Sequence, residues 1–125
     1  MNLIIEAIFI GFYASCFAII PMKINLYLYL FIIGFLKHFL SYYLKIQDYY
    51  CYIKKHKKAN KNYYIIKDSI YEGLCFIILG NIIIKVFNLQ NNLFLALFLL
   101  GFIFHIIAEY IDIHKFFLKY RCENK

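Results

Sequence analysis

The sequence predicts an all-α membrane protein with four transmembrane helices, arranged as two tandem two-helix repeats. Three observations support this fold class. The 125-residue chain is 64% hydrophobic, against about 45–50% in soluble domains, and its mean hydropathy is +0.66. Its apolar residues form four long runs, and its basic residues gather between and after them. A soluble domain of this length could not bury so much apolar surface, because small domains leave much of their surface in water.

The four apolar runs are the predicted membrane spans, and they cover residues 3–20, 26–46, 69–87 and 93–113. Each is close to the roughly 20 residues that cross the hydrocarbon core as a helix, and a helix satisfies its own backbone hydrogen bonds in lipid. The first run has no basic start and contains Glu6, so we interpret it as a span and not as a signal peptide. The chain therefore divides into a first two-span repeat (1–46), a basic loop (47–68), a second two-span repeat (69–113) and a basic tail (114–125).

The charges in the connecting segments predict the orientation. Seven lysines lie within residues 45–67 and four more basic residues follow the last span, whereas the opposite side has only Lys23 and Lys85. By the positive-inside rule the basic loop and the C-terminus are cytoplasmic, and an even number of spans places the N-terminus there too. We therefore expect an integral multi-pass protein with both termini in the cytoplasm. Four loop lysines are candidates to attract anionic lipid: Lys54, Lys55, Lys57 and Lys58.

The two halves of the chain share a pattern of polar residues. A shift of 67 residues superposes the second span on the fourth and aligns Asn25 with Asn92, Gly34 with Gly101, His38 with His105, and Tyr43 with Tyr110. The first and third spans align at a shift of 66 residues, which places Glu6 on Glu72. Shared Leu and Phe follow from composition, but matched Gly, His, Tyr and Asn in one register indicate a duplication. Since each repeat has two spans, the predicted pseudo-twofold axis runs along the membrane normal.

Ionisable residues within the spans mark the candidate site, because charges in lipid are costly and usually face the bundle interior or a water-filled cavity. They recur by repeat, as Glu6 with His38 and as Glu72 with His105. At about 1.5 Å per residue, both glutamates are expected about one turn inside the cytoplasmic boundary. The predicted ion or proton site in the cytoplasmic half consists of Glu6, His38, Glu72, His105 and Glu109, with Tyr43 and Tyr110 as supporting residues.

Several chemistries fit this cluster. Histidine and carboxylate groups pass protons near neutral pH, and they can also coordinate a cation or a lipid headgroup. His105 and Glu109 are four residues apart and could share a divalent metal, although the sequence leaves any metal unknown. Alternatively, the histidines fix packing through interhelical hydrogen bonds, and the glutamates are stabilised by the dipoles of their helix N-termini. No cofactor is expected, because no catalytic or nucleotide-binding motif occurs.

These observations predict a structural or interaction component of a membrane, and we do not expect an enzyme. A small proton- or cation-linked channel or transporter is the first alternative, and a membrane-embedded enzyme acting on lipid is the second. The expected partner is the lipid bilayer, together with further copies of the chain if it conducts ions, because four helices enclose little space. The net charge of +7 lies in two blocks without a nucleic-acid-binding motif, so we expect no nucleic-acid partner. Cys51 and Cys122 are expected to be reduced thiols on the cytoplasmic side.

Overall fold

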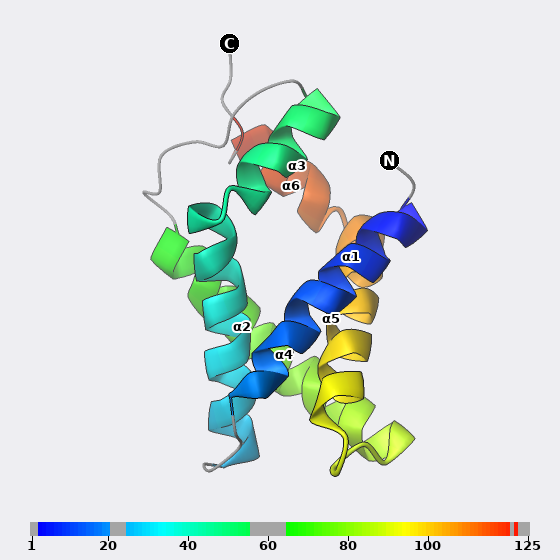
Figure 1. Cartoon of the computed structure of the whole chain (residues 1–125). Helices are drawn as coiled ribbons and strands as arrows, with labels where there is room; N and C mark the ends of the chain where they lie inside the picture. Colours follow the sequence, from blue (N-terminus) through cyan, green and yellow to red (C-terminus); the bar gives the residue numbers. More distant parts are fainter. Residues whose placement is uncertain (1–2, 21–24, 56–64, 121, 123–125) are drawn as a thin grey trace.

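All the described elements of the protein are helices, as the sequence predicts. The computed structural model describes residues 3–20, 25–55, 65–120 and 122. Its elements in chain order are α1 (Leu3–Ser15), the 3-10 helix η1 (Cys16–Ile19), α2 (Leu26–Tyr43), α3 (Ile46–Lys55), α4 (Ile65–Phe87), α5 (Leu93–Tyr110) and α6 (Ile113–Tyr120). Helices α1, α2, α4 and α5 form the body of the molecule, and the short helices α3 and α6 lie together at one end (Figure 1).

The four long helices pack as two pairs, and each pair takes one helix from each half of the chain. The most extensive contacts are those of α2 with α4 and of α1 with α5, whereas α1 and α2 touch only slightly. The pairs therefore join residues far apart in sequence. Because helices of different halves pack together, side chains of one half meet side chains of the other half at the candidate site.

Glycines stand where each pair crosses most closely. An ideal Cβ on Gly34 of α2 would lie 2.8 Å from the Cα atom of Gly73 on α4. The second crossing is similar, because a Cβ on Gly101 of α5 would lie 3.2 Å from the Cα atom of Gly11 on α1. Small residues let helix backbones approach closely, and this drives helix association in lipid.

Two helices of the same length occupy corresponding places in the two halves. α2 and α5 each contain 18 residues, and both begin after an asparagine, Asn25 or Asn92, whose side chain accepts a hydrogen bond from a backbone amide of the first turn. Both end before a residue with positive φ, which is Lys45 (63°) or Asp112 (64°). The predicted second and fourth spans ran on to Ile46 and Ile113. In the structure these spans end at Tyr43 and Tyr110, because the left-handed residue turns the chain into α3 or α6.

Three helices are long and apolar enough to cross a membrane, which fits a multi-pass membrane protein. They are Leu26–Tyr43, Ile65–Phe87 and Leu93–Tyr110, and a shorter apolar helix covers Leu3–Ile19. The third predicted span, 69–87, is longer in the structure because α4 begins at Ile65. The first run stays a predicted span, since it is shorter than the other three.

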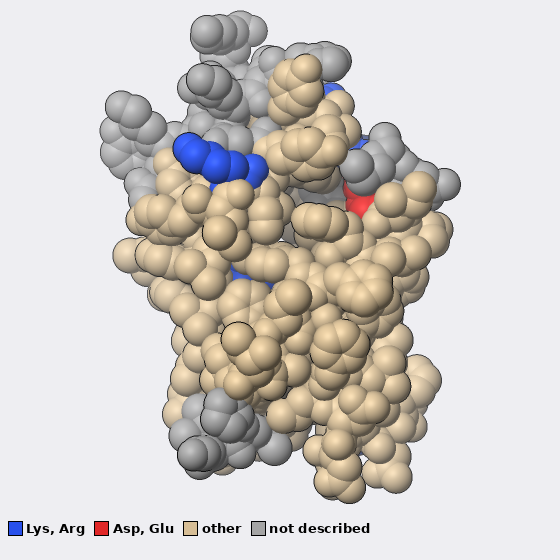
Figure 2. Space-filling view, viewed as in Figure 1, with Lys and Arg blue, Asp and Glu red and all other residues tan. Residues whose placement is uncertain are grey.

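The apolar core lies in the half of the bundle away from α3 and α6. Its buried residues come from the C-terminal part of α4, the 3-10 helix η1 and the N-terminal parts of α2 and α5: Phe17, Tyr29, Leu30, Ile33, Phe76, Ile83, Ile84, Ala96, Leu97 and Leu100. On the face shown in Figure 2, the charged side chains lie nearer to α3 and α6, and the described surface of the opposite end is uncharged. Charged and apolar packing are thus separated along the bundle.

Candidate functional site

A cavity of about 670 Å³ lies between the two helix pairs, beneath α3 and α6. All six α-helices contribute to its wall, and most of the lining residues are aliphatic or aromatic. The ionisable residues of the wall include Glu6, Lys37, His38, Asp68, Glu72 and His105. The cavity is therefore an apolar space with charged groups on two sides.

The first charged cluster forms between α2 and α4, around the buried carboxylate of Glu72. The Lys37 ammonium lies 2.5 Å from one carboxylate oxygen, and His38 Nδ1 lies 2.8 Å from the other. The Lys37 nitrogen also lies over the rings of Phe76 and Phe104, at 5.6 and 5.7 Å from their centroids. Both oxygens of the carboxylate are thus held by positively charged or titratable groups of α2.

Helix α3 extends this cluster toward the end of the bundle. The side-chain amide nitrogen of Gln47 lies 3.4 Å from His38 Nε2 and donates a hydrogen bond to the Ser41 hydroxyl at 3.0 Å. Gln47 therefore links two side chains of α2, the His38 imidazole and the Ser41 hydroxyl, to α3.

The second cluster forms around Glu6 and joins α1, α3 and α5. Lys54 Nζ lies 2.7 Å from Oε1 of Glu6, and His105 Nε2 lies 3.2 Å from Oε2. The phenol of Tyr50 on α3 is near this carboxylate. Burial, together with the negative charges of Glu6 and Glu109, raises the pKa of the Tyr50 hydroxyl and keeps it neutral. The carboxylate of each glutamate thus contacts one lysine and one histidine.

The structure pairs each glutamate with the histidine of the other half of the chain. The sequence comparison grouped Glu6 with His38 and Glu72 with His105, whereas the contacts are Glu6–His105 and Glu72–His38. The reason is the packing of α1 against α5 and of α2 against α4.

The two glutamates also stand at different depths. Gly11 and Gly73 occupy matching positions, because an added Cβ on either would meet the backbone oxygen of Phe98 or Phe31, both at 2.9 Å. Glu6 lies five residues before its crossing glycine, and Glu72 only one residue before. The four-residue difference is about 6 Å of helix rise. Glu6 is therefore nearer to α3, within reach of Lys54, and Glu72 is deeper, within reach of Lys37.

Three of the predicted site residues lie apart from the cavity wall. Glu109 is exposed, Tyr43 is 54% exposed and Tyr110 is 78% exposed. None of them lines the cavity. Glu109 follows His105 by one turn, but it is exposed, while its neighbour Ala108 in the same last turn of α5 is buried.

Lys37 and Lys54 belong to the charged clusters, although neither was among the predicted ion or proton site residues; Lys54 was expected only as one of the lysines that attract anionic lipid. Lys37 is only 7% exposed, although it is a charged residue in the middle of an apolar span. Its position beside His38 was a usable signal, because a lysine this far from a helix end requires a nearby carboxylate. The counterpart of Lys37 under the shift of 67 residues is Phe104, so no repeated pattern drew attention to it.

No group of three metal-binding side chains occurs among the described residues. Lys54 is paired with Glu6, while Lys57 and Lys58 lie outside the described residues, as does the side chain of Lys55. A lysine on each carboxylate opposes a divalent cation, because its fixed positive charge already occupies the oxygen.

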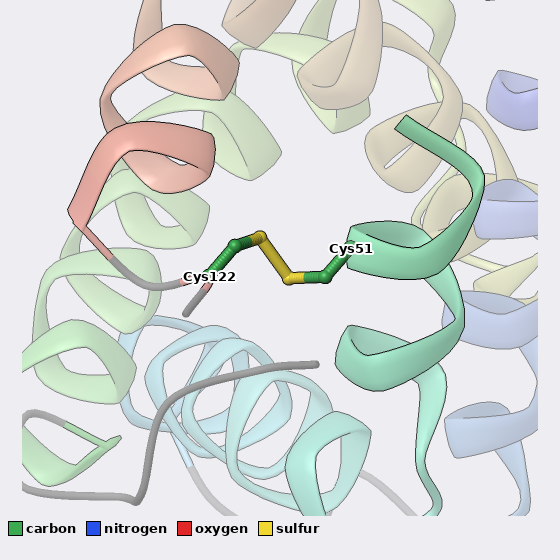
Figure 3. Close-up of a disulfide and its surroundings, with 2 residues drawn as sticks. All are labelled: Cys51 and Cys122. Carbon is green, nitrogen blue, oxygen red and sulfur yellow. A yellow bond between two sulfur atoms is a disulfide. The ribbon is translucent and has the colours of Figure 1, made fainter. Parts of the chain in front are cut away.

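A disulfide joins the two halves above the cavity. Cys51 of α3 is bonded to Cys122, which follows α6, with the two Cα atoms 5.7 Å apart (Figure 3). Both residues are fully buried. The expectation of two reduced thiols therefore differs from the structure, because folding brings together two residues with a sequence separation of 71. Cys16 and Cys75 remain free thiols.

Three helices long and apolar enough to cross a membrane support a multi-pass membrane protein, and a cavity with charged groups on two sides lies at one end of it. No protein-family model matches the chain, and no curated protein or solved structure shows significant similarity to it. Functional conclusions therefore rest on the geometry of this chain.

Proposed function

We propose that the chain is a four-span membrane protein with both ends on the cytoplasmic side, built from two tandem two-span repeats, and that it binds a lipid-like amphiphile in its cavity. It would then act as an interaction component of its membrane. The observation that carries this proposal is the cavity of about 670 Å³, with apolar walls and two charged clusters. Its volume falls within the range of about 300–1,000 Å³ that is typical of ligand pockets.

Two features support the four-span, two-repeat architecture. The first apolar run has 13 residues of α-helix and four of 3-10 helix, which extend about 27 Å and nearly cross a hydrocarbon core of about 30 Å. The shift of 67 residues also relates the start of α2 to that of α5, the capping residues Asn25 and Asn92, and the left-handed residues Lys45 and Asp112. The basic loop and tail support the cytoplasmic placement of the cavity end.

The distribution of charge favours binding over conduction. The charged clusters lie in the half nearest α3 and α6, and the opposite half is closed by packed apolar side chains such as Leu30, Phe76 and Leu97. A proton or cation pathway needs polar groups or water along its whole length. The alternative of a channel or transporter would therefore require a second conformation or an oligomer.

The clusters suggest the chemistry of the ligand head. A lysine ammonium has three N–H donors. Within the described chain, Glu72 accepts a hydrogen bond from Lys37, and the same ammonium lies over the rings of Phe76 and Phe104. In this proposal its other donors bind the head of the ligand. A carboxylate or phosphate head fits these donors, and an acyl chain fits walls such as Phe9, Ile10 and Phe104. The lining thus matches an amphiphile with an acceptor head and an apolar tail.

The test is binding of a fluorescent long-chain carboxylate to the full chain in detergent, with one blocking variant and one matched control. Cys75 lines the cavity, so Cys75→Phe should reduce or abolish binding. Cys16 is exposed and does not line it, so Cys16→Phe should leave binding unchanged. Equal binding by both variants, or no saturable binding by the wild type, would contradict the proposal. Circular dichroism of both variants shows whether the bundle is intact.

A further inference from the structure

Helices α3 and α6 form a roof over the cavity. Gln47, Tyr50 and Ile53 of α3 line it from one half of the chain, and Ile113, Phe116 and Phe117 of α6 line it from the other. Neither helix has the length of a membrane span. We use the term roof helices for α3 and α6.

Two contacts among the described residues join the roof helices directly. The rings of Tyr50 and Phe117 meet edge to face at 5.7 Å, and the Cys51–Cys122 disulfide is the covalent link. α3 also reaches the bundle through Lys54 and Gln47. The disulfide is thus a covalent connection between the two roof helices.

Each roof helix is attached to its span by a single turn. Lys45 (φ 63°) precedes α3 and Asp112 (φ 64°) precedes α6. Such a left-handed conformation costs about 1–2 kcal/mol for a residue other than glycine. A change of φ and ψ at these two residues would alter the angle between a roof helix and its span, and for α3 it would also break the contacts of Gln47 with α2 and of Lys54 with Glu6. These two residues are the turns about which the roof helices would move.

We propose that the Cys51–Cys122 disulfide is a redox latch that keeps the roof closed, and that its reduction lets the roof helices separate and opens the cavity to its ligand. This inference rests on the proposed binding function and names the regulation of the same site. Since the basic loop places this end on the cytoplasmic side, cellular thiols are expected to reduce the latch, and oxidative conditions are expected to close it.

The latch reaction is a thiol–disulfide exchange. Both cysteines are buried, so the exchange begins when a local opening of the roof exposes the bond. A thiolate of glutathione then attacks one sulfur of the Cys51–Cys122 bond, forms a mixed disulfide with it and releases the other sulfur as a thiolate. A second glutathione thiolate then displaces the first cysteine and forms glutathione disulfide. Two electrons pass from two glutathione molecules to the two cysteines, which take up protons as thiols. Glutathione disulfide drives the reverse reaction.

The experiment compares the oxidised and reduced full chain in detergent. The probe is the same fluorescent long-chain carboxylate, and the readout is its dissociation rate after dilution. We expect dissociation on the order of tenfold faster after reduction, because gating of a bound ligand appears mainly in the off-rate. Cys51→Ser/Cys122→Ser should behave as the reduced protein under both conditions. Cys16→Ser, which removes a free thiol that does not line the cavity, should keep the redox response.

A second measurement follows the roof itself. Spin labels attached by a non-cysteine chemistry at Tyr49 of α3 and Lys115 of α6, both exposed, report the separation of the roof helices. Their distance distribution should lengthen and broaden on reduction. An unchanged distance, or equal dissociation rates in the two redox states with binding intact, would refute the latch and leave the binding function standing. Absence of binding with a redox-dependent distance would refute the binding function while the latch stands.

Discussion

Replacement of Gly34 by alanine should separate α2 from α4 and weaken the Glu72 cluster. The new Cβ would lie 2.8 Å from Gly73 Cα and 2.9 Å from the Glu72 backbone oxygen, and both atoms belong to the backbone of α4. An ordinary contact begins at 3.4 Å, so the helices must part by about 0.6 Å, from 2.8 to 3.4 Å. Overpacking of this kind costs about 1–3 kcal/mol.

The same displacement reaches the cavity. His38 lies one turn after Gly34 on the same face of α2, and its Nδ1 atom is 2.8 Å from Glu72 Oε2. A separation of 0.6 Å would lengthen this contact to 3.4 Å, beyond the limit of about 3.2 Å for a good hydrogen bond. We therefore expect a loss of stability together with a change in the imidazole of His38.

Gly80→Ala is the matched control. Its added Cβ would also come within 2.9 Å of neighbours, but those atoms are the methyl ends of Leu30, which can rotate away. Both substitutions gain about 1 kcal/mol of helix propensity, so their difference isolates the backbone crossing. The assay is reversible unfolding in detergent, with nitrogen NMR of the His38 ring. Equal stability of the two variants and an unchanged His38 spectrum would refute the reasoning.

Three further predictions concern other parts of the molecule. Gly101→Ala should act like Gly34→Ala and lengthen the His105–Glu6 contact from 3.2 Å, because its Cβ would lie 2.9 Å from the Ile10 backbone oxygen; NMR of the His105 ring measures this. Cys51→Ser/Cys122→Ser should lose up to about 4 kcal/mol of unfolding free energy under non-reducing conditions, since the bond closes a loop with a sequence separation of 71, and no loss relative to wild type should remain in reductant. Lys37→Met should weaken binding of the carboxylate probe by about tenfold or more, because a hydrogen bond to a charged group contributes about 1.5–3 kcal/mol; unchanged affinity would exclude Lys37 from the head site.

The long helices of this protein could be read from local patterns, whereas α3 and α6 lie mostly in segments predicted as a basic loop and a basic tail. Long apolar runs separated by polar segments gave an all-helical prediction, because a helix in lipid must satisfy its own backbone groups. Asn25 and Asn92 were visible as repeated residues before the second and fourth spans, and both cap helices. The repeated histidines likewise drew attention to the cavity end of the bundle, where both make contacts with glutamates.

The contacts between helices were decided by the tertiary structure. Sequence alone could not show that α1 packs on α5 and α2 on α4, since this choice depends on how Gly11, Gly34, Gly73 and Gly101 let backbones meet. In this packing each histidine contacts the glutamate of the other half of the chain, in place of the one with which the sequence had grouped it. The same packing places Lys37 beside Glu72. It also left Glu109 exposed and placed Cys51 beside Cys122. Local sequence thus determined which segments are apolar helices, while packing at the glycine crossings determined which charges share a cavity, because only folding brings distant residues within bonding distance.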